Sequence, residues 1–188
     1  MKKEILTQEE KLEHKHVSSS GNPAVYVGTY HKYNNGNLSG LWVDMTSFYD
    51  YDDFIEFCER LHADEEDPEL MFQDFENFPK TWYFEGGINE EIFDKIIEYA
   101  NEDLDDEEKE AFEEYLEDYP DDTISDFQDK SIGCFYTDAE CAEFIAGYDE
   151  RFNDIPKEFK SCIDYDRLWN SFYRFDYTQY GKYYLSNY

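Results

Sequence analysis

Residues 102–118 carry eleven carboxylate side chains in seventeen positions, and Lys109 is the single base among them. Like charges at i,i+3 and i,i+4 weaken a helix, so this density calls for a functional reason. Seventeen helical residues span about 25 Å at ~1.5 Å each, which gives one carboxylate per roughly 2.3 Å. Duplex DNA carries about one charge per 1.7 Å of its axis. The segment therefore predicts a folded surface that imitates DNA phosphates.

Other carboxylates of the acidic middle of the chain could extend this surface. What they share is a position on an expected helix, loop or strand with few bases nearby. As candidate partner-binding groups we take Asp52, Asp53, Glu56, Glu59, Asp64, Glu65, Glu66, Asp74, Glu76, Glu102, Asp103, Asp105, Asp106, Glu107, Glu110, Glu113, Glu114, Glu117 and Asp118.

Catalysis and metal binding explain the acidic residues less well. With 47 acids in the chain, no single pair stands out as a general acid and base. The sequence contains no phosphate-binding glycine loop, serine-hydrolase elbow or zinc-protease motif. Residues 50–53 lack the downstream Gly and Glu of a calcium loop, and His14 and His16 lie in an expected flexible segment. We therefore predict no enzyme activity, no cofactor and no metal.

The net charge of −31 is confined to one region. Residues 44–129 hold 33 acids and four bases, a net −29, whereas residues 130–188 hold ten acids and seven bases, a net −3. Such charge usually accompanies disorder, but aromatic residues make up 20% of the chain, which favours a folded protein with a buried core.

The acidic balance also limits the partners. Direct binding of nucleic acid or of an anionic membrane needs Lys and Arg, so neither is expected. The sequence has no apolar run long enough to span a membrane and no signal peptide. Its four cysteines form no C-x-x-C pair, and we expect them to be small apolar residues of a reducing compartment. We expect a cytoplasmic protein with a basic partner.

Apolar spacing predicts an α+β chain that begins with a flexible extension over residues 1–23. Residues 24–31 and 38–45 alternate around the turn signal of residues 34–37, which predicts a β-hairpin. Asp50 then begins a helix with Phe54, Cys58 and Leu61 on one face.

The middle of the chain is predicted to be mainly helical, after a short strand over 70–78. Asn89 caps one helix, and Phe112, Tyr115, Leu116 and Tyr119 give the acidic segment a narrow apolar stripe. The last part combines a strand over 131–136, a helix capped by Thr137 and Glu140, a helix over 162–172 and a terminal strand over 180–188.

Four segments resemble the ArdA-type antirestriction proteins. They are VYVGTYHKYNNGNLSGLW (25–42), FQDFENFP (72–79), SIGCFYTDAECAEF (131–144) and IPKEFKSCIDYDRL (155–168), in matching order and spacing over about residues 24–187. The resemblance implies a protein of mobile genetic elements that mimics bent B-form DNA. Such proteins occupy the DNA-binding groove of type I restriction-modification enzymes and block them.

The resemblance also implies an elongated chain of three small domains. On this sequence they are an N-terminal α+β domain (24–63), an acidic, mainly helical domain (64–125) and a C-terminal α+β domain (126–188) through which two copies form a homodimer. The antirestriction segment of the family corresponds to about Cys141–Pro156. The alternative function is an acidic binding protein for another basic DNA-binding partner, such as a nucleoid protein or transcription factor.

Overall fold

The computed structural model describes residues 3–188, and the chain divides after Asp103 into two compact units. Both units mix helices with a small sheet, in agreement with the expected α+β class. The division into three domains is not confirmed. The strand β3 (Leu70–Glu76), which we placed in the middle domain, pairs with β1 (Ala24–Thr29) in the first sheet.

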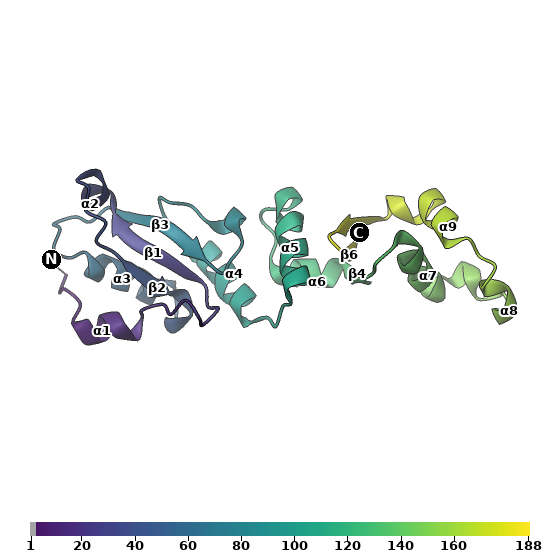
Figure 1. Cartoon of the computed structure of the whole chain (residues 1–188), viewed down its shortest axis with the longest axis horizontal. Helices are drawn as coiled ribbons and strands as arrows, with labels where there is room; N and C mark the ends of the chain where they lie inside the picture. The colour runs from purple at the N-terminus through teal and green to yellow at the C-terminus, as the bar shows by residue number, and fades with distance from the viewer. Residues whose placement is uncertain (1–2) are drawn as a thin grey trace. The chain divides into compact units, whose positions relative to one another are not determined.

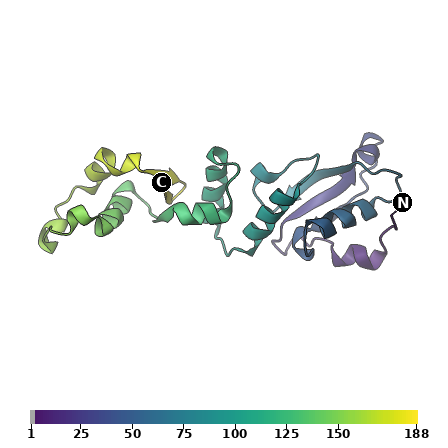
Figure 2. The same cartoon turned by 180° about the vertical axis from the view of Figure 1, so that it is seen from behind.

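The N-terminal unit is built around a three-stranded antiparallel sheet of order β2-β1-β3. The helices α3 and α4 cover one face of this sheet, as Figures 1 and 2 show from opposite sides. The other elements of the unit are α1 (Gln8–Glu13), α2 (Tyr30–Asn34), β2 (Leu41–Asp44), η1 (Met45–Ser47), α3 (Tyr51–Leu61), η2 (Lys80–Trp82) and α4 (Glu90–Asn101).

The predicted pairing of the first two strands is confirmed, but the connection between them is not a tight hairpin turn. Val25 pairs with Val43, and Val27 with Leu41. The short helix α2 joins the strands, because the hydroxyl of Thr29 accepts a hydrogen bond from the backbone N–H of Lys32 (3.2 Å) and begins a helical turn. The expected turn residue Gly36 follows the end of α2 with a φ of 73°, a conformation that favours glycine.

The helices α3 and α4 begin where the sequence predicted. The side chain of Asp50 accepts a hydrogen bond from the N–H of Asp53 (3.0 Å), and that of Asn89 from the N–H of Ile92 (2.9 Å). Each satisfies a backbone donor that has no partner inside its helix. The apolar stripe of α3 is buried as expected, with Phe54 and Cys58 fully inaccessible to solvent.

Residues 3–23, expected as a flexible extension, instead contain the helix α1 and pack on the N-terminal unit. The sequence does contain a helix-start motif that our prediction overlooked. Thr7 and Glu10 form a capping box around the first turn of α1. Leu6 and His16 are buried, at 5% exposure each.

The C-terminal unit holds a second antiparallel sheet, of order β4-β6-β5. Its elements are α5 (Asp106–Asp118), α6 (Ile124–Lys130), β4 (Ser131–Cys134), α7 (Asp138–Tyr148), η3 (Glu150–Phe152), α8 (Lys157–Lys160), α9 (Tyr165–Ser171), η4 (Tyr173–Phe175), β5 (Tyr177–Tyr180) and β6 (Tyr183–Ser186). The prediction of a single terminal strand over 180–188 was wrong, because two strands, β5 and β6, lie here. Gly181 adopts a φ of 54° and reverses the chain, so that β5 and β6 form a hairpin.

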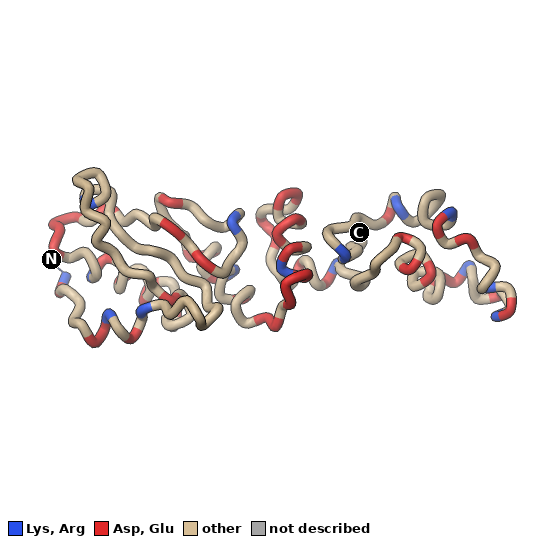
Figure 3. The backbone as a smooth tube through the Cα atoms, viewed as in Figure 1, with Lys and Arg blue, Asp and Glu red and all other residues tan. Residues whose placement is uncertain are grey.

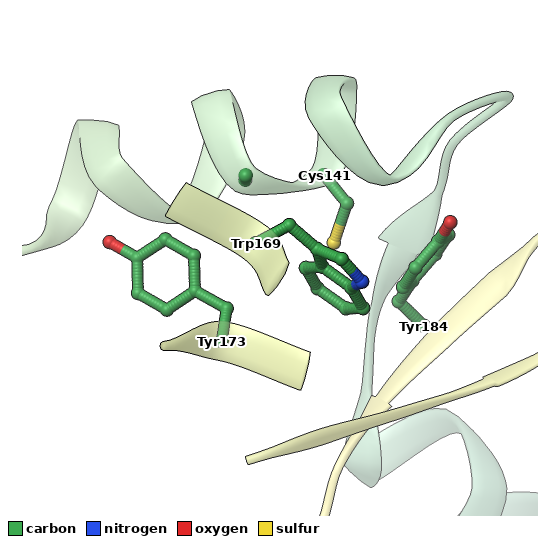
Figure 4. Close-up of a cluster of buried hydrophobic side chains, with 5 residues drawn as sticks. Cys141, Trp169, Tyr173 and Tyr184 are labelled. Carbon is green, nitrogen blue, oxygen red and sulfur yellow. The ribbon is translucent and has the colours of Figure 1, made fainter. Parts of the chain in front are cut away.

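An aromatic cluster joins α7 and α9 to the sheet of this unit (Figure 4). Trp169 packs edge-on against Tyr184 with ring centroids 5.2 Å apart, and Cys141 is buried beside them. The Tyr184 hydroxyl donates to a carboxylate oxygen of Asp138 (2.7 Å), which satisfies its polar end. Thr137 caps α7 as predicted, but the Glu140 carboxylate accepts from the N–H of Tyr136 rather than from that of Thr137.

Candidate functional site

The helix α5 gives the acidic segment a definite face. Asp105 caps it by accepting from the N–H of Glu108 (2.8 Å). Ala111, Phe112, Tyr115 and Leu116 turn one side into the core, at 0–1% exposure. At 100° per residue, the seven exposed candidate carboxylates of the helix fall within about 140° on the opposite side: Asp106, Glu107, Glu110, Glu113, Glu114, Glu117 and Asp118. The acidic residues on this helix are visible in Figure 3.

Three of these seven carboxylates form an inner edge that binds the hairpin of β5 and β6. Glu114 accepts from the backbone N–H of Gly181 (2.8 Å), and Asp118 accepts from the Tyr180 hydroxyl (2.9 Å). Glu107 forms an ion pair with Lys182. The edge carboxylates therefore stabilise the fold as well as carry charge, and this role depends on contacts between distant residues that no local pattern reveals.

The other four carboxylates form an outer stripe: Asp106, Glu110, Glu113 and Glu117. Their spacing of four, three and four residues aligns them along the helix, over a rise of about 16 Å at 1.5 Å per residue. Within residues 3–188 none of the four forms an ion pair or accepts a hydrogen bond from a side chain. This outer stripe is the part of α5 most available to a basic partner.

Most candidates of the N-terminal unit are also exposed, whereas Glu59, Glu65 and Glu76 are half-buried, and the chain's own bases engage several of them. Lys32 binds Asp64 (2.8 Å) and lies 3.5 Å from Glu65, and its hydrogen bond is the main cause that lowers the pKa of Asp64. Lys3 pairs with Glu59, and Glu76 contacts the buried His16 (3.0 Å). Exposed candidates without such a pair in the described part of the chain are Asp52, Asp53, Glu56, Glu66, Asp74, Glu102 and Asp103.

Further exposed carboxylates lie on α4 and were not among our candidates. Glu90, Glu91 and Asp94 face solvent on the side opposite the buried Phe93 and Ile96. The spacing of Phe93 and Ile96 in the sequence could have identified them, since a helix that buries one face exposes the other.

A polar network anchors α5 within the C-terminal unit. Lys130 donates to the Tyr115 hydroxyl (2.6 Å) and to Asp122 (2.8 Å), and its ammonium lies 4.8 Å from the ring centre of Tyr119. Burial and the hydrogen bond to Asp122 raise the pKa of Tyr115 to about 12. The apolar seam predicted for this helix thus ends in Tyr119, which is 43% exposed and lies beside Lys130.

The cysteines differ from the expectation. All four are free thiols, and Cys58 and Cys141 are buried as predicted, but Cys134 and Cys162 are exposed. Over residues 3–188, no group of three His, Cys, Asp or Glu side chains is arranged to hold a metal ion, and no helix is long and apolar enough to cross a membrane. His14 and His16 point to different partners, Ser47 and Glu76.

The helix α5 thus presents a dense carboxylate face to solvent, and its opposite side packs into an aromatic core. The chain matches the family described as antirestriction protein (ArdA) over residues 25–185. It therefore belongs to the ArdA family of antirestriction proteins, which inhibit restriction enzymes and are not a known enzyme family. No curated protein matched the chain. The segment implied for antirestriction, Cys141–Pro156, comprises most of α7 and the turn η3.

Proposed function

We propose that this protein mimics B-form DNA and inhibits type I restriction-modification enzymes by occupying their DNA-binding groove. The observation that carries the proposal is the outer stripe of α5, whose carboxylates make no ion pair within residues 3–188. Lys and Arg side chains that normally bind DNA phosphates are the expected contacts of such a stripe.

Competition with DNA for a purified type I methyltransferase tests this proposal. We expect the protein to displace a labelled duplex from the enzyme, and the displacement to weaken as salt rises, because the contacts are ionic. An enzyme that binds DNA and this protein at once would contradict groove occupancy. Binding to a nucleoid protein or transcription factor instead would favour the alternative of a different basic partner.

A charge-matched pair of variants tests the stripe itself. The stripe variant carries Asp106→Asn, Glu110→Gln, Glu113→Gln and Glu117→Gln. The control removes four exposed charges elsewhere, with Glu4→Gln, Glu9→Gln, Glu13→Gln and Glu158→Gln. Exposed ion pairs contribute about 0.2–1 kcal/mol each, so four lost pairs weaken inhibition by roughly fourfold or more. Equal loss in both variants would mean that net charge, and not the stripe, determines binding.

We further propose that two copies associate through residues 126–188. The small net charge of residues 130–188 lets two surfaces approach without strong repulsion, and exposed aromatic side chains, which are enriched in interfaces, lie there. Tyr148 is 79% exposed and Phe175 64% exposed. Sedimentation at micromolar concentration distinguishes dimer from monomer, and a monomer would remove this part of the proposal without affecting DNA mimicry.

A further inference from the structure

The N-terminal strap, defined as residues 3–16, precedes the part of the chain that matches the family and yet forms extensive contacts with the N-terminal unit. Its helix α1 has only six residues, and isolated helices of this length are unstable in water. The contacts of the strap with the body of the unit must therefore hold it in place.

The first set of contacts is backbone pairing along the outer edge of β2. Lys15 forms an antiparallel bridge with Val43. The N–H of His16 donates to the carbonyl of Trp42 (2.9 Å), and the N–H of Asp44 donates to the carbonyl of His14 (3.0 Å). An edge strand with unpaired N–H and C=O groups is a template for pairing with another chain. The strap occupies this template on β2.

The second set of contacts joins the strap to the C-terminal half of α3. The Arg60 guanidinium donates to the Glu10 carboxylate (2.7 Å) and, through Nε, to the carbonyl of Glu4 (3.2 Å). Hydrogen bonds from Thr7, followed by that from Arg60, lower the pKa of Glu10 to about 2. Lys3 pairs with Glu59 of the same helix. Arg60 thus recognises both a side chain and the backbone of the strap.

The third set is apolar and aromatic. The His14 ring stacks on Phe48 with centroids 4.3 Å apart and meets the edge of Phe57 at 4.8 Å. Leu6 is buried, and so is the side chain of His16, whose Nε2 lies 3.0 Å from the carboxylate of Glu76 on β3. The strap therefore spans from α3 across the edge of β2 to the far strand of the sheet.

We propose that the outer edge of β2 and the C-terminal half of α3 form a peptide-binding groove, and that the strap is its built-in occupant. By filling the groove in cis, the strap closes the edge of the sheet against pairing with a second copy of this chain. Backbone pairing supplies the affinity, while Arg60 and the aromatic rings of Phe48 and Phe57 that contact His14 supply the selectivity. This role is separate from the inhibition of restriction enzymes.

Binding of the strap in trans tests the groove directly. In a chain lacking residues 2–16, we expect sedimentation to show self-association beyond that of the full chain, and a synthetic peptide of residues 3–17 to reverse this additional association. A peptide with Glu10→Gln loses the charged partner of Arg60 and should bind roughly tenfold more weakly. A peptide with Glu9→Gln carries the same charge change on an exposed residue of the same turn and should bind as the parent does.

If the truncated chain does not fold, a second measurement, on the full chain, tests the proposal. We expect the amide hydrogens of His16 and Asp44 to exchange slowly, and Glu10→Gln to speed their exchange roughly tenfold while Glu9→Gln does not. Exchange of both amides at the rate of an unfolded peptide, or equal effects of the two substitutions, would overturn the proposal. A well-folded truncated chain that associates no further than the full chain and does not bind the peptide would overturn it too.

Discussion

Removing charge from the outer stripe should make the fold more stable while it weakens inhibition. The triple variant Glu110→Gln, Glu113→Gln and Glu117→Gln leaves Asp106 in place, because an acid in the first turn interacts favourably with the helix dipole. All three substituted side chains are exposed, and none forms an ion pair or a side-chain hydrogen bond within residues 3–188. Gln has nearly the helix propensity of Glu, so the change isolates the charge.

The size of the effect follows from the spacing of charges on α5. The triple variant removes six like-charge pairs at i,i+3 or i,i+4 and one opposite-charge pair, between Lys109 and Glu113. At about 0.2–0.5 kcal/mol per pair, the net gain is about 1–2.5 kcal/mol, and solvent screening favours the lower end. For a unit of this size, 1 kcal/mol raises the melting temperature by about 4–8 °C.

Thermal melts in 50 mM salt measure this gain, and the gain should shrink at 0.5 M salt because counter-ions screen the repulsion. The matched control is Asp118→Ala, which removes one acid of the inner edge. It leaves the hydroxyl of the buried Tyr180 without its acceptor, so it should cost about 1–3 kcal/mol. A triple variant that melts below the parent would refute the reasoning, since the stripe would then be serving the fold.

Two further predictions concern residues outside α5. The His62 ring accepts a hydrogen bond from the Lys32 ammonium (2.9 Å) and contacts the carbonyl of Val27 (3.2 Å). Burial of the ring, followed by the charge of Lys32, lowers the pKa of His62. Because the folded pKa lies below the unfolded value of about 6.5, this contribution to stability is present above that pH and is lost as the pH falls below it. Denaturant melts at pH 7.5 and 5.5 should show the loss in the parent but not in His62→Gln. Gly40→Ala should lower the free energy of unfolding by about 1–3 kcal/mol, because a Cβ at this position would lie 2.5 Å from the Val27 carbonyl oxygen. Gly147→Ala should raise it by up to about 1 kcal/mol, because Gly147 lies in the helix α7 with open space where a Cβ would be added. Equal melting of the two glycine variants would contradict the steric account.

Helices for which the sequence shows both a capping residue and a repeating apolar stripe were predicted well. The helices α3, α4 and α5 have an Asp or Asn cap and a repeating apolar stripe, and the structure contains them, although α5 covers Asp106–Asp118 and not all of the seventeen residues 102–118 that we expected to be helical. These signals are local, since a cap and a stripe involve residues within a few turns of each other.

The misses depend on contacts between distant residues or on a short signal that was overlooked. The strap is held by Arg60 and by the edge of β2, which are more than 25 positions away along the chain. The turn at Gly181 lies beside Ala111 of α5, a placement that no local pattern reveals. Of the candidate carboxylates, exposure could be predicted from helical period, whereas the engagement of Glu114 by the Gly181 amide could not.

The division of α5 into an inner edge and an outer stripe explains how the chain tolerates its charge. The inner edge supplies acceptors to the hairpin of β5 and β6, so three carboxylates stabilise the unit that carries them. On the opposite side, Phe112 and Tyr115 pack edge-on against Phe127 of α6 with centroids 5.5 Å and 5.4 Å apart, and buried aromatic pairs add stability beyond their area. Repulsion among the outer carboxylates costs a few tenths of a kcal/mol per pair, whereas burying one large apolar side chain contributes about 1.5–3 kcal/mol. Burial of these aromatic side chains therefore offsets the repulsion among the outer carboxylates. The positions of those carboxylates can then suit a binding partner instead of the stability of the fold.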